Sequence, residues 1–255
     1  MKTVKDTLWI WGHPVNSLKH CAGLEKDSDV SALDAMYAFG AGKIFYVPMG
    51  RALDRVACNR EMAEAGELGW SIESAQDVEA LIAQKADFPN LTCGIFDDFF
   101  SESNAGRNYL QYSLEQLIDL REKMHSAGLE MWVVFYTMQV SMEEWKPYLS
   151  LFDGVTYWFW DEPDNDLFDE KCRWFVENTP NQKRMIGCYF YNFGQAKEAT
   201  VESVRYQLDR DLEMLKDGTI EGIILHTNAV GGMGFAAYDE ALRWTAEHGD
   251  DEIKV

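Results

Sequence analysis

The chain has no long apolar run and little positive charge. No segment approaches the roughly 18 apolar residues that a membrane-spanning helix needs, and the opening MKTVKDTLWIWGHP lacks the apolar centre of a signal peptide. The formal net charge is -20, so we expect no basic surface that could neutralise nucleic-acid phosphates. The sequence therefore predicts a soluble protein without membrane or nucleic-acid partners, cytoplasmic as given, or periplasmic or secreted if a leader has been removed.

Several motifs of common enzyme classes are also missing. The five cysteines are odd in number and widely spaced within apolar segments, which argues against a disulfide framework or a zinc knuckle. The chain contains no GxSxG, no HExxH and no glycine-rich phosphate fingerprint after its first predicted strand. No lysine stands at the predicted strand ends, where a Schiff-base enzyme would need one. We therefore predict no cofactor and no resident metal, and the sequence does not indicate an oligomeric state.

What the chain does contain is a regular alternation of two kinds of segment. With 47% apolar residues over 255 positions, it can build one sizeable core. Each apolar stretch is followed by a helical pattern, such as the one with a capping box at Ser113 and Gln116 and a glycine stop at Gly128. Eight such units match the size and order of a (β/α)8 TIM barrel, an α/β fold, as a single domain over residues 1–255. The predicted strands are 8–12, 43–48, 69–73, 92–97, 130–136, 154–160, 184–190 and 221–226.

Two of the predicted strands end in paired acids. The stretch GIFDDFF carries Asp97 and Asp98, and the stretch YWFWDEPD carries Asp161 and Glu162. Because side chains alternate along a strand, we expect positions 94, 96 and 98 to face the barrel axis, and likewise positions 158, 160 and 162. This parity brings Asp98 and Glu162 to the inner side. The competing interpretation is that each acid caps the helix that follows it, since Asp favours that position.

The carboxyl ends of the strands form the active-site rim of such a barrel. A glycosidase needs two carboxyl groups flanking the scissile bond, and flat aromatic faces that pack on sugar C–H groups. We therefore predict a glycoside hydrolase for a small-molecule or oligosaccharide substrate, with Asp98 and Glu162 as the catalytic pair. Tryptophans and Asp161 near Glu162 are expected to raise its pKa, so that it acts as the acid while Asp98 stays ionised. The predicted substrate-binding residues at this rim are His13, Glu73, Asp97, Tyr136, Trp160, Asp161, Tyr191, Asn192, His226 and Asn228.

Three aromatic residues of these strands allow two interpretations. Trp11, Trp158 and Tyr189 provide flat faces on which a sugar could stack, but they equally suit the packed interior of a barrel. Trp160 and Tyr191 lie nearer the predicted rim, which favours the binding interpretation for these two.

At these residues the chain also resembles known proteins. GIFDDFF, YWFWDEPD and IGCYFYNFG look like phrases of uncharacterised bacterial barrel proteins usually labelled glycoside-hydrolase-like, over residues 90 to 230. Acids that end the fourth and sixth strands are similar to those of the α-galactosidase and α-glucosidase type of barrel. The resemblance implies that Asp98 is the nucleophile and Glu162 the acid/base. The α-galactosidase type carries aspartate at the second position, whereas this chain has glutamate preceded by Asp161.

Two other functions remain compatible with the pattern. A metal-dependent sugar isomerase, epimerase or lyase could hold a divalent ion with Glu73, Asp98, Glu162 and His226, because barrel ligands come from separate strands and leave no local motif. A non-catalytic carbohydrate-binding barrel would keep the aromatic residues without requiring any particular spacing of the carboxyl groups.

Overall fold

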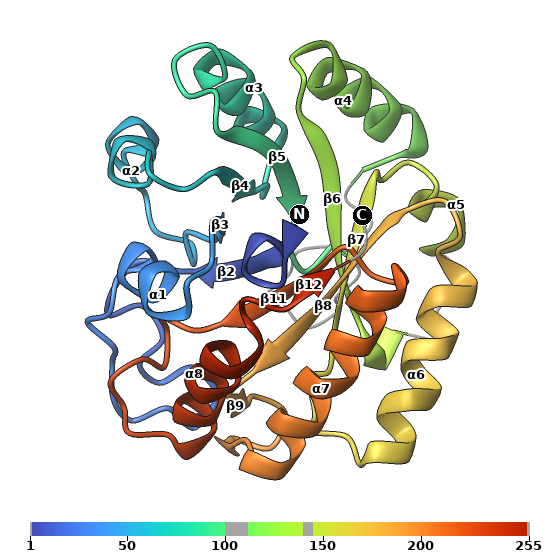
Figure 1. Ribbon diagram of the computed structural model, residues 1–255. Coiled ribbons are helices and arrows are strands. Elements are labelled where there is room, and N and C mark those ends of the chain that lie inside the picture. The colour runs from blue at the N-terminus through green and yellow to red at the C-terminus, as the bar shows by residue number, and fades with distance from the viewer. Residues whose placement is uncertain (1, 100–111, 140–144, 254–255) are drawn as a thin grey trace.

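Within the described residues, eight parallel strands close into a barrel, and helices surround it (Figure 1). The computed structural model describes residues 2–99, 112–139 and 145–253. The barrel strands are β2 (Leu8–Gly12), β3 (Lys43–Tyr46), β4 (Glu67–Ser71), β5 (Leu91–Phe96), β6 (Glu130–Tyr136), β7 (Gly154–Trp158), β8 (Lys183–Tyr189) and β11 (Gly222–His226). Their order is β11-β2-β3-β4-β5-β6-β7-β8, and β11 pairs with both β2 and β8. The predicted (β/α)8 fold is confirmed. The third barrel strand begins two residues earlier than predicted, at 67 rather than 69.

The helices follow the strands in the predicted alternation. They are α1 (Ala32–Phe39), α2 (Arg55–Glu61), α3 (Ala75–Gln84), α4 (Leu114–Ser126), α5 (Lys146–Leu149), α6 (Asn165–Asn178), α7 (Val201–Asp217) and α8 (Ala236–His248). The capping box that begins α4 is present: Gln116 N–H donates to Ser113 Oγ at 3.2 Å, and Ser113 N–H donates to Gln116 Oε1 at 2.8 Å. Gly128, just after this helix, has a φ of 72°, as expected for a glycine stop.

The barrel interior is filled by large rings that lie beside glycines. Trp132 on β6 pairs in register with Gly154 on β7, and Trp158 pairs with Gly187 on β8. A Cβ atom at Gly187 would lie 2.2 Å from the Trp158 ring, so only glycine leaves room for the indole. Trp11 and Trp158 are 5% and 1% exposed, which supports the core interpretation for both. The inward-facing cluster is Trp9, Trp11, Phe45, Val47, Cys93, Ile95, Trp132, Val134, Tyr136, Trp158, Met185 and Ile224.

Charged pairs line the amino-terminal end of the barrel. Lys43 lies 2.5 Å from Glu67, and Lys183 lies 2.5 Å from Glu130. The Trp132 indole N–H donates to Glu130 Oε2 at 3.0 Å. Because these carboxylates already have cationic or donor partners, we assign them a structural role at this end of the barrel.

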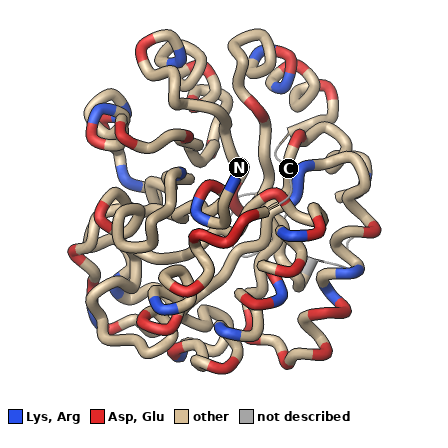
Figure 2. The backbone as a smooth tube through the Cα atoms, viewed as in Figure 1, with Lys and Arg blue, Asp and Glu red and all other residues tan. Residues whose placement is uncertain are grey.

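Short strands and dispersed charge complete the molecule. Strands β1 (Lys2–Thr3) and β12 (Glu252–Ile253) pair antiparallel and hold the two ends of the chain together (Figure 1). A hairpin that was not predicted, β9 (Tyr191–Asn192) with β10 (Lys197–Glu198), follows β8. Acidic residues are spread over the outer helices, and the basic residues are scattered among them (Figure 2). Among the helices of the described ranges, none has the length and apolar character to cross a membrane.

Candidate functional site

Inward-facing side chains continue past the strand ends and meet at the carboxyl-terminal mouth of the barrel. Tyr136 ends β6, Tyr189 ends β8 and His226 ends β11, while Asp97 and His13 follow β5 and β2 directly. Hydrogen bonds and ring contacts connect these residues to one another across the mouth. The site is therefore assembled from separate strands, as is usual for this fold.

Asp97, not Asp98, follows the inward parity of β5. Cys93 and Ile95 belong to the inward cluster, whereas a Cβ at Gly94 would approach Met124 of α4, outside the barrel. The prediction that positions 94, 96 and 98 face inward was therefore wrong. Both faces of this strand are apolar, so the alternation of residue types carried no information on its direction. At Asp98 the backbone turns, with a φ of 52°, and its N–H donates to Asp97 Oδ1 at 2.9 Å.

The environment of Asp97 favours its protonated form. Burial, followed by the charges of Asp98 and Glu73, raises the pKa of Asp97 to about 8. Hydrogen bonds from the Asp98 N–H and from the Tyr136 hydroxyl, at 2.9 and 3.4 Å, oppose this shift only in part. At neutral pH the carboxyl group of Asp97 therefore holds a proton that it can donate to a ligand oxygen.

Aromatic rings form one wall beside Asp97. The Tyr136 ring lies 5.6 Å from Trp160 edge-on, and Trp160 lies 6.3 Å from Tyr189. Burial, followed by the charge of Asp97, raises the pKa of both tyrosine hydroxyls, so they act as neutral hydrogen-bonding groups. Phe193, in the hairpin loop, contacts Trp160, Tyr189 and His226 with ring centroids 5.8, 5.2 and 5.1 Å apart. Phe193 was missed, because nothing in the sequence distinguished this hairpin from an ordinary loop.

Tyr189, and not the predicted Tyr191, joins Tyr136 in this wall. Tyr191 belongs to β9, stacks on Phe235 at 5.7 Å and donates its hydroxyl to the carbonyl of Ala22 at 2.8 Å. The predicted inward position of Tyr191 was therefore wrong. The strand β8 ends at Tyr189, and the hairpin that begins two residues later interrupts the alternation on which the prediction depended.

Two histidines meet at the other side of the mouth. His13 Nδ1 lies 3.2 Å from the Val47 carbonyl, which only accepts, so Nδ1 carries the ring proton. His13 Nε2 must then accept the hydrogen bond from His226 Nε2 at 3.2 Å. Burial lowers the pKa of His13 to about 4, and burial with the His13 charge also lowers the pKa of His226 well below its usual range, so both rings are neutral near pH 7. His226 Nδ1 is left as a buried acceptor with no hydrogen-bond partner in the described part of the chain.

Asn228 positions this pair and does not face a ligand. Its Oδ1 accepts from the His13 N–H at 2.9 Å, and its Nδ2 donates to the carbonyls of His13 and Val30 at 2.9 and 3.1 Å. The predicted hydroxyl-binding role of Asn228 is therefore replaced by a structural one, which ties the loop after β11 to the end of β2.

Glu162 lies at the start of α7. Its Oε1 accepts from the Thr200 N–H at 2.9 Å and from the Thr200 hydroxyl at 2.5 Å, and Lys197 Nζ lies 4.0 Å from Oε2. Burial opposes ionisation, but the hydrogen bonds from Thr200 and Ser203 and the Lys197 charge outweigh it and lower the pKa. The predicted raised pKa of Glu162 was therefore wrong. The interpretation that this acid serves a helix start fits better, although the helix is α7 and not the one that follows directly.

The remaining predicted residues have mixed surroundings. Asn192 is buried and accepts from the Gln195 N–H at 2.9 Å, within the hairpin loop. Asp161 is exposed beside Gly194. Glu73 lies close enough for its charge to raise the pKa of Asp97. Within residues 2–99, 112–139 and 145–253, no three His, Cys, Asp or Glu side chains cluster as metal ligands would, so the proposed ion site of four strand-end residues is not formed.

Comparisons with known proteins identify the fold and no more. No protein-family model and no curated protein matches the sequence. Among solved structures, a mutant tryptophan synthase α-subunit from Pyrococcus furiosus has 11% identity and a TM-score of 0.55, over 97% of this chain and 98% of that chain. A family 18 chitinase from Crocus vernus has 11% identity and a TM-score of 0.56, over 93% of this chain and 99% of that chain. At this identity the likeness supports the barrel fold alone.

Proposed function

We propose that the protein is a glycoside hydrolase in which Asp97, rather than the predicted Glu162, supplies the acid. The observation that carries the proposal is the carboxyl group of Asp97, whose pKa is raised to about 8, beside a wall of aromatic rings at the barrel mouth. A glycosidase acid must be protonated at neutral pH and must face the glycosidic oxygen. The aromatic wall suits the C–H face of a sugar. The chitinase among the fold neighbours is itself a glycoside hydrolase.

The reaction requires Asp97 to transfer its proton to the leaving oxygen as the anomeric C–O bond breaks. Water then supplies the hydroxyl group to the anomeric carbon, and the proton that it loses restores the acid. We assign the second carboxylate to Asp98, which follows Asp97 directly and whose charge raises the pKa of Asp97 more than that of Glu73 does. Glu162 stays a second candidate for that role.

Kinetics with paired substrates test the assignment. On an alkyl glycoside, whose leaving group needs a proton, Asp97→Asn should lower kcat/KM by on the order of 10² to 10⁴. On a 4-nitrophenyl glycoside, which needs no protonation, Asp97→Asn should keep most of its bond-breaking rate, whereas Asp98→Asn should lose activity on both substrates. Asp29→Asn, an exposed change elsewhere, is the matched control. Full activity of Asp97→Asn on the alkyl glycoside would remove the acid assignment. Sugar binding without turnover by the unmodified protein would favour the carbohydrate-binding alternative.

A further inference from the structure

A cavity lies on the outer side of the barrel wall, next to the end of β2. It has a volume of about 220 Å³ and lies between the barrel wall and helices α1 and α2. Most of its surface is apolar. Its lining residues that carry apolar side chains are Pro14, Val15, Ala32, Leu33, Leu53 and Met62. The cavity opens to solvent, because Val15 and Glu61 of its lining are exposed, so a small molecule can enter it.

The size and lining of the cavity indicate the kind of group that fits. An apolar cavity of about 150 Å³ is enough to bind benzene, whereas complete drug-sized ligands need about 300 Å³ or more. A volume of about 220 Å³ therefore suits one substituted aromatic ring. The exposed carboxylate of Glu61 stands at the edge of the cavity, and the chain carries a net charge of -20, so an anionic group is disfavoured.

The cavity is continuous with the candidate site through one residue. His13 lines it, and the same imidazole is 3.2 Å from His226 inside the barrel mouth. The two loops above the cavity are held together, because Arg51 Nη1 donates to the carbonyl of Val15 at 3.1 Å. A ligand group seated here would therefore contact His13, next to loops that the Arg51 hydrogen bond holds together.

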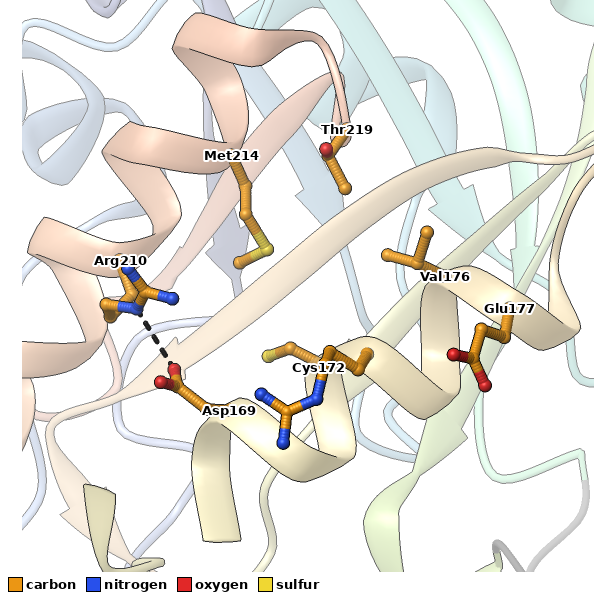
Figure 3. A pocket seen from close by; sticks show the side chains of 8 residues that line it. Asp169, Cys172, Val176, Glu177, Arg210, Met214 and Thr219 are labelled. Carbon is orange, nitrogen blue, oxygen red and sulfur yellow. Dashed lines mark hydrogen bonds and ion pairs between the residues drawn. The ribbon is translucent and has the colours of Figure 1, made fainter. Parts of the chain in front are cut away.

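We propose that this cavity binds an uncharged aromatic group, about the size of a substituted benzene ring, next to the barrel mouth. The site is separate from the carboxyl groups of the proposed reaction, and its test does not depend on turnover. By contrast, the cavity between α6 and α7 is about 340 Å³ in volume and lies away from the mouth, and the ion pair of Arg210 and Asp169 forms part of its lining (Figure 3).

Thiol alkylation provides a direct measurement, because Cys58 lines the proposed cavity. Cys21 is also partly buried but lies outside it, and serves as the internal control. The rate at which N-ethylmaleimide modifies each thiol is followed by peptide mass spectrometry, with benzyl alcohol or benzoate present. At about ten times its dissociation constant, benzyl alcohol should slow alkylation of Cys58 roughly tenfold and leave Cys21 unchanged. Benzoate, of similar size but negatively charged, should protect much less.

Filling the cavity supplies the second arm of the experiment. Leu33→Trp replaces an aliphatic side chain of the lining with a larger indole ring, which should fill the cavity and slow Cys58 alkylation without any ligand. Benzyl alcohol should then add little further protection. Leu167→Trp, at an exposed position on α6, is the matched control and should behave as the unmodified protein. Equal Cys58 rates with and without benzyl alcohol, up to its solubility, would overturn the proposal. Protection of Cys172 instead, which lines the cavity between α6 and α7 (Figure 3), would also overturn it.

Discussion

The raised pKa of Asp97 predicts that the native acid destabilises the fold. Between the pKa of an ordinary aspartate, 3.8, and the folded value of about 8, the folded protein retains a proton that the unfolded chain has released. The folded state binds more protons in this window, so its contribution to stability falls as pH rises from about 4 to about 8. Asp97→Asn removes the ionisable group and should remove this loss.

The expected magnitude follows from the size of the shift. Each pKa unit corresponds to about 1.4 kcal/mol, so the cost of keeping Asp97 at pH 7 reaches at most about 4 kcal/mol. We expect Asp97→Asn to raise the free energy of unfolding by about 2 to 4 kcal/mol at pH 7. For a chain of this length, that corresponds to a rise in Tm of roughly 5 to 15 °C. The same variant should lose activity on the alkyl glycoside, so stability and the acid-dependent reaction would move in opposite directions.

Urea unfolding at a series of pH values between 3 and 9 measures this effect. The difference between Asp97→Asn and the unmodified protein should be near zero below pH 4, grow with rising pH, and become constant above pH 8. Taking the difference removes the contribution of every other titrating group that the change leaves unaltered. Asp29→Asn, the exposed control, should show no such trend. A difference that does not depend on pH, or a variant that is less stable at pH 7, would refute the assignment of a protonated Asp97.

Three further changes follow from the same structure. Glu162→Gln should destabilise the protein by about 1 to 2 kcal/mol at pH 7 in urea unfolding, because it replaces the charged acceptor of the Thr200 N–H and hydroxyl with a neutral one. This difference in stability should disappear as pH falls through the lowered pKa of Glu162. Asp211 is fully buried, burial raises its pKa, and one of its oxygens has no partner within the described residues. Asp211→Asn should therefore raise the free energy of unfolding at neutral pH by on the order of 1 kcal/mol and flatten its decline above pH 4. An unchanged dependence on pH would contradict this. Gly187→Ala should lower the free energy of unfolding by about 1 to 3 kcal/mol, because the added Cβ would lie 2.2 Å from the Trp158 ring. Calorimetry should show that adding Trp158→Phe to Gly187→Ala restores part of the lost stability.

The fold was predictable because its signals are local and repeated. Each apolar strand segment is followed by a helix with its own start or stop, such as Ser113 and Gly128 around α4, and eight repetitions leave few alternatives to a barrel. The pKa of Glu162 was predicted wrongly because its hydrogen-bond partner is distant in the sequence, where no local pattern can reveal it. The partner, Thr200, lies 38 positions further along the chain, at the start of α7. The helix α6, the strand β8 and the hairpin lie between Glu162 and Thr200 in the sequence.

The direction of Asp97, in contrast, depends on the register between neighbouring strands and not on a pattern along one strand. A large ring on one strand repeatedly faces a glycine at the register position of the next strand: Phe45 with Gly69, Trp132 with Gly154, and Trp158 with Gly187. Register partners in a parallel sheet point to the same side, and Gly69 in turn pairs with Cys93. Since Phe45 faces inward, Cys93 must also face inward, and the alternation along β5 then brings Asp97 to the barrel axis. Ring–glycine pairs also occur on the outer side of the barrel, where Trp70 pairs with Gly94. The direction of β5 therefore follows from the chain of register partners that starts at the inward-facing Phe45, and not from a glycine beside a ring alone.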